Sequence, residues 1–464
     1  MRSDLLEKIE FGKYEKAVDQ CVLMWPEGRI SQVIGLIAEG DSLGLGIGGL
    51  CSILNDQGKE VQAEVVGFKK EKALFMPYGD IRGISLGSRI IPLMASQEIG
   101  VSDQLLGRVV DGMGCLIDGK GNIEYTKTYN LYGKPMGPMQ RKPIKEPLDV
   151  GVAAINSMIT LGKGQRVGIM AGSGVGKSVL MGMMTKHTSA DVVVIGLIGE
   201  RGREVKDFIN DTLGEEGLKR AVVVAATSDS PPLVRIRGAY LATTIAEYFR
   251  DQGKDVLLMV DSITRFAMSS RDVGLAAGEP PTSRGYTPSF FVQIPILLER
   301  AGNMENGGSI TGIYTVLVEG DDMNDPVGDT VRSIVDGHIV LSRNLANQGH
   351  YPAIDVLASV SRVMRDVSQK EHVVLRNKAV SVISAYRGAE DMITIGAYID
   401  GSDPDVDEAK KLMPGITQFL RQDMTRRMDI QSSVDGLRQA LGIKKPDKPK
   451  PDKPDKPKPD KPVK

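Results

Sequence analysis

The eight residues Ala171-Gly-Ser-Gly-Val-Gly-Lys-Ser178 decide the fold of this chain. They fit the pattern of a phosphate-binding loop, small-x-x-x-x-Gly-Lys-Ser/Thr, with alanine at the first position, where glycine is commoner. The three glycines let the backbone curl until its N–H groups point inward and form a nest for phosphate oxygens. The flanks fit as well, because residues 166–170 are typical of a short buried strand and residues 179–185 of a helix. A glycine-rich turn that matches by chance is the weaker alternative.

The motif assigns a ligand to each part of the loop. Its lysine, Lys177, reaches the β- and γ-phosphates of a nucleotide, and its serine, Ser178, places a hydroxyl on Mg²⁺. A nucleotide with Mg²⁺ is therefore the predicted ligand. The residues predicted to line the nucleotide are Ala171, Gly172, Ser173, Gly174, Val175, Gly176, Lys177 and Ser178.

Composition argues against several classes of protein. A chain of 464 residues is too long for one hydrophobic core, so several domains are expected. No apolar run approaches the roughly 20 residues that span a bilayer, and the first residues show no secretory signal. The three cysteines stand far apart, which favours a reducing cytoplasm and argues against a structural metal. A net charge of −1 gives no electrostatic reason to expect nucleic acid as a partner.

The spacing of apolar residues predicts an α/β protein in five parts. Short apolar runs between Gly, Asp and Asn turns, the first at 30–37, predict a β-barrel. Farther along, a connector rich in Gly and Pro (93 to about 165) leads to apolar strands that alternate with helical stretches, which predicts a mainly parallel sheet with helices on both faces. The predicted strands are 166–170, 191–198, 221–226, 255–261, 310–318 and 339–342. The predicted parts are an N-terminal helical segment (1–24), a β-barrel domain (25–92), a nucleotide-binding domain (93–368), a C-terminal helical domain (369–443) and a disordered tail (444–464).

The tail has a composition of its own. Residues 444–464 hold nine lysines, seven prolines and four aspartates, without an aromatic residue. Such a segment cannot bury a core and is predicted to be extended and disordered. A solvated appendage is favoured over a weak electrostatic tether to an acidic surface.

Two acidic residues follow predicted strands and supply chemistry that a nucleotide needs. Asp261 ends the apolar run Val256-Leu-Leu-Met-Val260, the position of an acid that holds Mg²⁺ or one of its waters. Glu200 lies just past another predicted strand and is the best candidate for the carboxylate that orients the attacking water. The alternative for Glu200 is a surface ion-pair cluster with Arg201 and Arg203.

Transfer of the γ-phosphoryl group also needs positive charge on its far side. Arg265 lies one helical turn past Asp261 and would act within its own subunit, whereas Arg362 is distant enough in sequence to reach into a neighbouring one. Judged from its spacing alone, each of them could also be a surface arginine without a role in the reaction. Tyr351 stands in a turn, where its ring would stack on adenine or simply be half buried.

Further motifs identify the family that this chain resembles. From about residue 25 to about residue 440 it is similar to the catalytic β-type subunits of rotary ATP synthases, and more closely to the ATPases of flagellar and type III protein export. Besides the phosphate loop, the motifs that carry the resemblance are Gly107-Arg-Val-Val-Asp-Gly112, Arg141-Lys-Pro-Ile-Lys-Glu-Pro147, Gly199-Glu-Arg-Gly-Arg-Glu204, Gly238-Ala-Tyr-Leu-Ala-Thr243, Asp261-Ser-Ile-Thr-Arg-Phe266, Gly278-Glu-Pro-Pro-Thr-Ser-Arg-Gly-Tyr286, Leu298-Glu-Arg-Ala-Gly302 and Gly320-Asp-Asp-Met-Asn-Asp-Pro326.

The resemblance implies a RecA-like central domain, ATP and Mg²⁺ as ligands, and a role for each matched residue. It makes Glu200 the catalytic glutamate, with Arg201 beside it, and Arg362 an arginine finger that reaches the site of the next subunit. The other matched residues are the phosphate-loop Lys177 and Ser178, the Mg²⁺-binding Asp261, the following Arg265 and the adenine-contacting Tyr351.

The resemblance also implies an assembly and a setting. Because Glu200 and Arg362 occur in one chain, a ring of identical subunits is expected, and the family's ring is a hexamer. Hydrolysis would help release or unfold chaperone-bound cargo, in the cytoplasm and peripheral to the inner membrane at the export apparatus. The implied partners are a peripheral stator-like regulator, a central stalk protein, export chaperones with their cargo, and the export gate, without nucleic acid. The segment Gly396-Ala-Tyr-Ile-Asp-Gly-Ser-Asp-Pro404 favours the flagellar over the injectisome type.

Two rival functions stay open at this point. An RNA-dependent hexameric helicase of the termination type shares the RecA-like core and should interleave aromatic residues with Lys and Arg in its barrel. Residues 28–92 hold only Phe68, Phe75 and Tyr78 as aromatics. The second rival is a ring subunit that binds nucleotide without turnover, against which Glu200 argues, because such subunits carry glutamine there.

Overall fold

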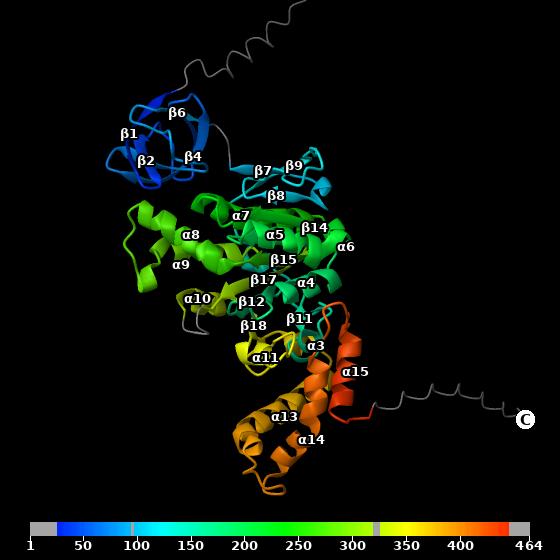
Figure 1. Cartoon of the computed structure of the whole chain (residues 1–464). Helices are drawn as coiled ribbons and strands as arrows, with labels where there is room; N and C mark the ends of the chain where they lie inside the picture. Colours follow the sequence, from blue (N-terminus) through cyan, green and yellow to red (C-terminus); the bar gives the residue numbers. More distant parts are fainter. Residues whose placement is uncertain (1–25, 94–96, 319–324, 445–464) are drawn as a thin grey trace, which may run out of the picture.

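The computed structural model describes residues 26–93, 97–318 and 325–444 and shows an elongated molecule (Figure 1). A β-barrel lies at one end, a mainly parallel sheet flanked by helices lies in the middle, and a group of helices lies at the other end. The predicted fold class is confirmed for these residues. The predicted helix in residues 1–24 and the predicted disorder of the tail, apart from Lys444, lie outside the described residues.

Strands β1 to β6 close the barrel in the order β1-β2-β5-β4-β3-β6. Buried apolar side chains, among them Ile53, Val65 and Phe75, fill its core. Where the sequence predicted one strand at 30–37, the structure has two, because Gly35 takes a left-handed φ of 57° and turns the chain into a hairpin. The barrel strands are β1 (Gly28–Ile34), β2 (Ile37–Asp41), β3 (Leu50–Leu54), β4 (Glu60–Lys69), β5 (Lys72–Pro77) and β6 (Arg89–Pro92).

The central sheet follows the order β19-β18-β12-β17-β15-β13-β14-β8, and its neighbouring strands from β18 to β8 run parallel. All strands predicted for this region occur, with ends that match or differ by one or two residues. The strands are β8 (Val109–Asp111), β12 (Arg166–Ala171), β13 (Val192–Ile198), β14 (Ala221–Ala226), β15 (Asp255–Asp261), β17 (Ser309–Leu317), β18 (Gly337–Leu341) and β19 (Val360–Ser361), while β16 (Gly302–Asn303) pairs with β17.

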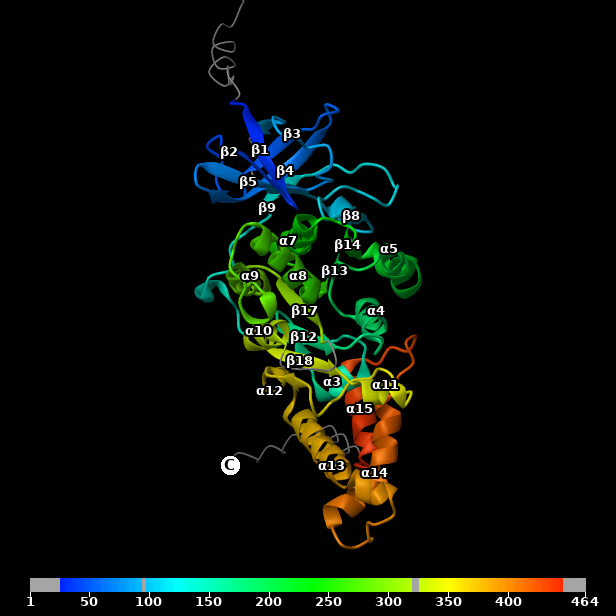
Figure 2. The ribbon, with the colours of Figure 1, turned by 60° about the vertical axis from the view of Figure 1, so that its left-hand side comes forward.

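Side chains on alternating sides of each central strand enter two separate hydrophobic cores. In β13, Val193 and Ile195 belong to one core, and Val192 and Val194 to the other. Helices α3, α4 and α5 cover the first core and α7 to α10 cover the second, on opposite sides of the sheet (Figure 2). The covering helices are α3 (Ala153–Met158), α4 (Lys177–His187), α5 (Gly202–Asp207), α7 (Pro232–Asp251), α8 (Ile263–Ala276), α9 (Pro288–Leu298) and α10 (Pro326–Ile334).

Residues 93–165 contain more than the predicted connector. Strand β7 (Glu98–Val101) pairs with β9 (Lys127–Asn130), and between them in the sequence β8 adds a parallel strand to the edge of the central sheet, beside β14. A strand of three residues has no periodicity that a sequence could reveal, so β8 was not predicted.

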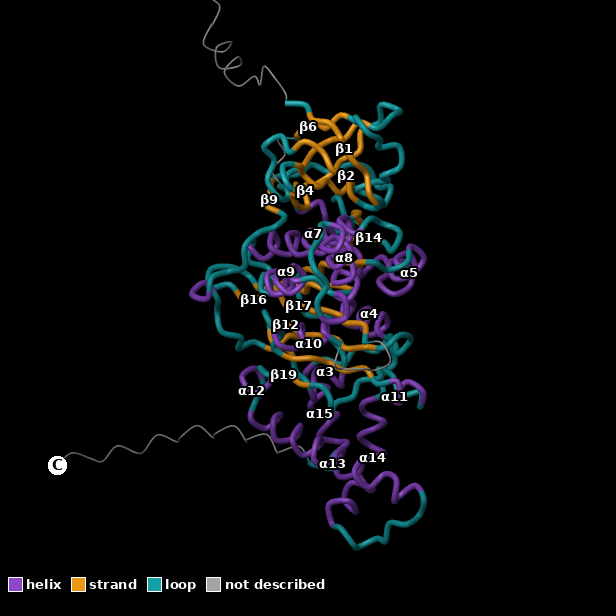
Figure 3. The backbone as a smooth tube through the Cα atoms, turned by 90° about the vertical axis from the view of Figure 1, so that its left-hand side faces the viewer, coloured by secondary structure: helices purple, strands orange, loops and turns teal. Residues whose placement is uncertain are grey.

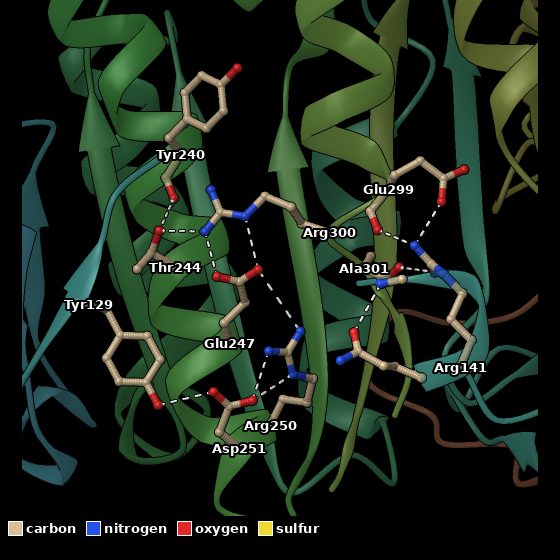
Figure 4. Close-up of polar contacts among 12 residues, drawn as sticks. Tyr129, Arg141, Tyr240, Thr244, Glu247, Arg250, Asp251, Glu299, Arg300 and Ala301 are labelled. Carbon is tan, nitrogen blue, oxygen red and sulfur yellow. Dashed lines mark hydrogen bonds and ion pairs between the residues drawn. The ribbon is translucent and has the colours of Figure 1, made fainter. Parts of the chain in front are cut away.

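A buried ion pair fastens this segment to the central domain (Figure 4). Arg300, whose side chain is fully buried, donates from Nε to Oε1 of Glu247 over 2.9 Å and from Nη2 to Oε2 over 2.5 Å. The same guanidinium donates to the hydroxyl of Thr244 on α7 over 2.8 Å and to the carbonyl of Leu131, just after β9, over 2.7 Å. The fork geometry of arginine thus joins α7, the end of α9 and the β9 segment in one hydrogen-bonded group.

Removal of Arg300 is expected to destabilise the protein strongly. Arg300→Met leaves Glu247 buried without the two hydrogen bonds from Arg300 and with only Arg250 Nη1 nearby, at 3.9 Å. We expect this to cost about 3 kcal/mol of unfolding free energy, measurable as a lower urea midpoint. The control is Arg82→Met, which removes an exposed arginine paired with Asp80 and is expected to leave the urea midpoint nearly unchanged, because solvent screens an exposed ion pair. Adding Glu247→Leu to Arg300→Met should recover part of the loss, because the buried carboxylate that lost its hydrogen bonds is then gone as well. Equal midpoints for the Arg300 and Arg82 variants would contradict this account.

Helices α13 (Lys370–Thr394), α14 (Pro404–Leu420) and α15 (Ile430–Ala440) make up the predicted helical part (Figure 3). Polar contacts as well as apolar ones attach it to the central domain. The buried His372 donates from Nε2 to the carbonyl of Ser157 over 2.7 Å, and the Gln422 side chain accepts the N–H of Ala153 over 2.7 Å. Within the described ranges, no helix combines the length and the apolar character that crossing a membrane requires.

Candidate active site

The phosphate loop joins the end of β12 to the start of α4, at the carboxyl edge of the central sheet. Gly174 and Gly176 take φ angles of 78° and 92°, which favour glycine, so the loop curls as the motif requires. Ser173 at its tip and Ser178 at the start of α4 are exposed. A curled loop at the N-terminus of a helix is suited to bind an anion such as a nucleotide phosphate.

Lys177 points from α4 toward two acidic side chains that come from neighbouring strands. Its Nζ lies 2.5 Å from Oδ1 of Asp261 and 3.5 Å from Oε1 of Glu200. Only 11% of the Lys177 side chain is exposed. Three charged groups that were predicted from three separate segments therefore meet at one point of the sheet edge.

Asp261 ends β15 and is held by two donors. Besides Lys177, the hydroxyl of Thr315 donates to Oδ1 over 2.6 Å. Thr315 belongs to β17, which lies between β12 and β15 in the sheet. No motif in the sequence marks Thr315, because a threonine within an apolar strand resembles any other strand residue.

Glu200 follows β13 after one residue, Gly199, and its side chain is largely buried. Burial raises the pKa of Glu200 to about 7, although the positive charge of Lys177 opposes this shift. A carboxyl group whose pKa lies near neutral pH is well suited to accept a proton from water. Glu200 is therefore buried beside Lys177, whereas Arg201 pairs with the exposed Glu204.

Arg265 lies against the backbone just before Glu200. Gly199 has a φ of 73°, and a Cβ on it would lie only 2.7 Å from the Cβ of Arg265, so the first side-chain carbons of Arg265 pack on this glycine. The Nε–H of Arg265 is buried and has no acceptor among the described residues. A buried donor without a partner is available to a ligand.

Arg201 and Tyr351 take different positions relative to the loop. Arg201 is 81% exposed and lies 3.4 Å from the exposed Glu204, so the structure does not bring it to Lys177 and Asp261 within this chain. The half-exposed ring of Tyr351 lies over the loop, since a Cβ on Gly176 would be 3.5 Å from two of its ring carbons. A nucleotide bound in the loop would therefore find an aromatic surface beside it.

Arg362 lies far from the phosphate loop of its own chain. Its N–H donates to the carbonyl of Asp336 over 2.9 Å, and the N–H of Asp336 donates to the carbonyl of Arg166, the first residue of β12. The loop begins at the other end of β12, about 17 Å away for a strand of this length. The exposed side chain of Arg362 therefore lies out of reach of the phosphate loop of its own chain.

The polar groups at the loop fit a Mg²⁺ ion that arrives with a nucleotide. Ser178, in the first turn of α4, offers an exposed hydroxyl. Asp261 offers a carboxylate oxygen, Oδ2, that receives no hydrogen bond from the described residues. Over the same residues, no cluster of three or more His, Cys, Asp or Glu side chains could hold a metal alone. This is the donor set expected for Mg²⁺, which keeps waters and takes phosphate oxygens as its remaining ligands.

With this geometry the chain falls among the P-loop nucleoside triphosphatases. Family models match along most of its length: the ATP synthase alpha/beta family nucleotide-binding domain at residues 151–361, the β-barrel domain of the same family at 30–94, and the T3SS EscN ATPase C-terminal domain at 368–439. The chain belongs to the ATP synthase alpha/beta family.

Two curated proteins show which members of this family the chain is similar to. The flagellum-specific ATP synthase of Pseudomonas aeruginosa is 48% identical over 444 residues, which cover 94% of this chain and 98% of that protein. That of Bacillus subtilis is 50% identical over 417 residues, which cover 89% and 95%. The predicted resemblance is therefore confirmed, and with it the class of enzyme, an ATPase.

Two solved structures of a type III secretion ATPase are also similar to this chain. The assembled ATPase EscN from the type III secretion system of enteropathogenic E. coli is 42% identical, with a TM-score of 0.85 over 89% of this chain and 100% of that one. EscN in complex with its central stalk EscO matches over the same shares, with a TM-score of 0.82. These matches favour an export ATPase over the RNA-dependent helicase.

Proposed function

We propose that this protein hydrolyses ATP with Mg²⁺ to energise protein export through the flagellar type III apparatus. The observation that carries the proposal is the meeting of Lys177, Asp261 and Glu200, with 2.5 Å and 3.5 Å between the lysine nitrogen and the two carboxylates. A lysine that lies between two acids at the phosphate loop is suited to turn to the β- and γ-phosphates of ATP.

The proposed roles follow from these positions. Glu200 accepts a proton from the attacking water, because its pKa is raised to about 7. Ser178 and Asp261 hold Mg²⁺, which neutralises charge on the phosphates when it is bound. Lys177 and Arg265 add positive charge from the same subunit, and Tyr351 stacks on the adenine ring. Arg201 is proposed as an outer member of the site, since its side chain points to Glu204.

We infer that the active assembly is a ring of identical subunits, with six members by analogy to the family. Arg362 cannot reach the loop of its own chain, so a neighbour must supply the finger for each pocket. EscN, a relative at 42% identity, has been solved as an assembled ATPase.

The proposed setting is the cytoplasmic side of the inner membrane, at the flagellar export apparatus. The names of the flagellar relatives, at 48% and 50% identity, favour the flagellar over the injectisome system. The proposed partners are a peripheral stator-like regulator, a central stalk protein, chaperones with their cargo, and the export gate. For the stalk, the EscN–EscO complex is the supporting precedent. Within the chain we propose that residues 25–92, 93–368 and 369–443 form the folded domains.

Phosphate release from purified protein tests the proposal. The full chain with Mg²⁺ and ATP is expected to release phosphate, without stimulation by RNA, and Lys177→Ala is expected to be inactive. Folded protein that binds ATP and releases no phosphate would contradict the proposal and favour a ring subunit without turnover. Release that depends on RNA would favour the helicase.

A further inference from the structure

Thr315 is a buried polar residue at the candidate site that no motif includes. It lies on β17, in register with Ile169 of β12 on one side, and next to Tyr314, which is in register with Val260 of β15 on the other. Its side chain is fully buried. A buried hydroxyl is costly unless it forms a hydrogen bond, and this one donates to Oδ1 of Asp261 over 2.6 Å.

Both donors to Asp261 contact the same oxygen. Lys177 and Thr315 lie 2.5 Å and 2.6 Å from Oδ1, whereas Oδ2 receives no hydrogen bond from any part of the chain that the structure describes. A carboxylate fixed through one oxygen presents the other in a defined direction. Asp261 is only 3% exposed, so few waters can replace a lost donor.

The two donors differ in what happens to them when ATP binds. The proposed function requires Lys177 to turn from Asp261 to the phosphates. Thr315 sits on a central strand whose backbone is paired on both sides, so it stays in place. In the nucleotide-bound site, the hydroxyl of Thr315 is then the remaining donor that holds Oδ1.

We propose that Thr315 is a positioning residue for Mg²⁺, which fixes the carboxylate of Asp261 so that Oδ2 faces the metal or its water. This inference rests on the proposed function, because it assigns Asp261 to Mg²⁺. Thr315 itself touches neither nucleotide nor metal. Its loss should weaken the response of the site to Mg²⁺ and leave nucleotide binding without metal unchanged.

Three variants of the full chain separate this role from a structural one. Thr315→Val keeps the shape of the side chain and removes the hydroxyl, whereas Thr315→Ser keeps the hydroxyl. The matched control is Thr311→Val, on the same face of the same strand, where the lost hydroxyl accepts the N–H of Gly164 at the opposite edge of the sheet. If Thr315→Val does not fold, Thr315→Ala serves for the same comparison.

The readouts are the affinity for a fluorescent ADP analogue with and without Mg²⁺, the Mg²⁺ dependence of phosphate release, and the thermal unfolding temperature. Thr315→Val is expected to need about tenfold more Mg²⁺ for half-maximal binding and activity, the loss expected for a hydrogen bond to a charged group. Its metal-free affinity should stay within about twofold of the wild type, since the loop is untouched. Thr315→Ser and Thr311→Val should both keep the wild-type Mg²⁺ dependence.

Equal Mg²⁺ dependence of Thr315→Val and the wild type would overturn the proposal. So would a Thr315→Ser variant as defective as Thr315→Val, because the hydroxyl would then not be the active feature. Wild-type protein that binds nucleotide and does not hydrolyse it would refute the proposed function alone. The effect of Mg²⁺ on binding would still decide the role of Thr315.

Discussion

Glu200→Gln is expected to bind ATP with near-normal affinity and to hydrolyse it at least about 100-fold more slowly, because an amide cannot accept the proton of the attacking water. The exchange keeps the size of the side chain and removes only its basicity. Binding should survive because the phosphate loop and Lys177 are unchanged. Nucleotide titration and single-turnover phosphate release, measured on the same sample, separate the two effects.

The matched control for this variant is Glu216→Gln. Glu216 lies on helix α6 (Gly214–Lys219), is exposed, and pairs with Lys219 over 2.5 Å. It is expected to hydrolyse ATP at the wild-type rate. Wild-type turnover by Glu200→Gln would show that another group activates the water.

The raised pKa of Glu200 also predicts how stability depends on pH. In the folded protein the pKa of Glu200 is about 7, whereas in the unfolded chain it returns to its ordinary value of 4.5. The protonated Glu200 therefore contributes to the free energy of unfolding at low pH. This contribution is lost as the pH rises from 4.5 through about 7. Without nucleotide, Glu200→Gln should unfold at a higher temperature than the wild type at pH 8, with a smaller difference at pH 5. A difference that is independent of pH would contradict the burial of an ionised Glu200.

Arg362→Ala is expected to fold and to bind ATP, and to lose about 10³-fold in the hydrolysis rate, the usual loss for an arginine finger. The reason is geometric, because Arg362 lies at the opposite edge of the sheet from its own phosphate loop and serves the next subunit. The defect should persist at high protein concentration, where rings assemble. Sedimentation and phosphate release at several concentrations measure both properties.

Arg365→Ala is the control for this variant. Arg365 is likewise exposed, on the next short helix, α12 (Met364–Val367). It should keep both assembly and activity. Full activity of Arg362→Ala would contradict the assignment of Arg362 as the arginine finger. So would a defect of the same size in Arg365→Ala.

Most of the fold could be predicted from the sequence because its signals are local. Strands such as β14 and β15 are runs of apolar residues buried on both faces, and the structure reproduces their predicted ends. The phosphate loop needs glycines at positions with positive φ, which the sequence displays directly. In contrast, β8 is a short edge strand whose position depends on its partner β14, which lies more than a hundred residues away.

Most residues of the site could be predicted because a chemically suitable residue type stands at or near the end of an apolar strand. Lys177, Glu200 and Asp261 follow or end apolar strands, and parallel strands bring their carboxyl ends to one edge. Thr315 contributes through one hydrogen bond across the sheet, and Gly199 through its contact with Arg265, so neither stands out before the strands are in register. The exposure of Arg201 depends on how α5 begins, which charge patterns do not determine.

The central claim is that one chain supplies the pocket from one subunit and the finger from the next. The most direct test mixes Glu200→Gln with Arg362→Ala, each nearly inactive alone, and measures phosphate release. In mixed rings, about one interface in four joins an intact pocket to an intact finger, so activity well above the sum of the separate samples is predicted. Mixed rings without recovered activity would contradict the shared pocket.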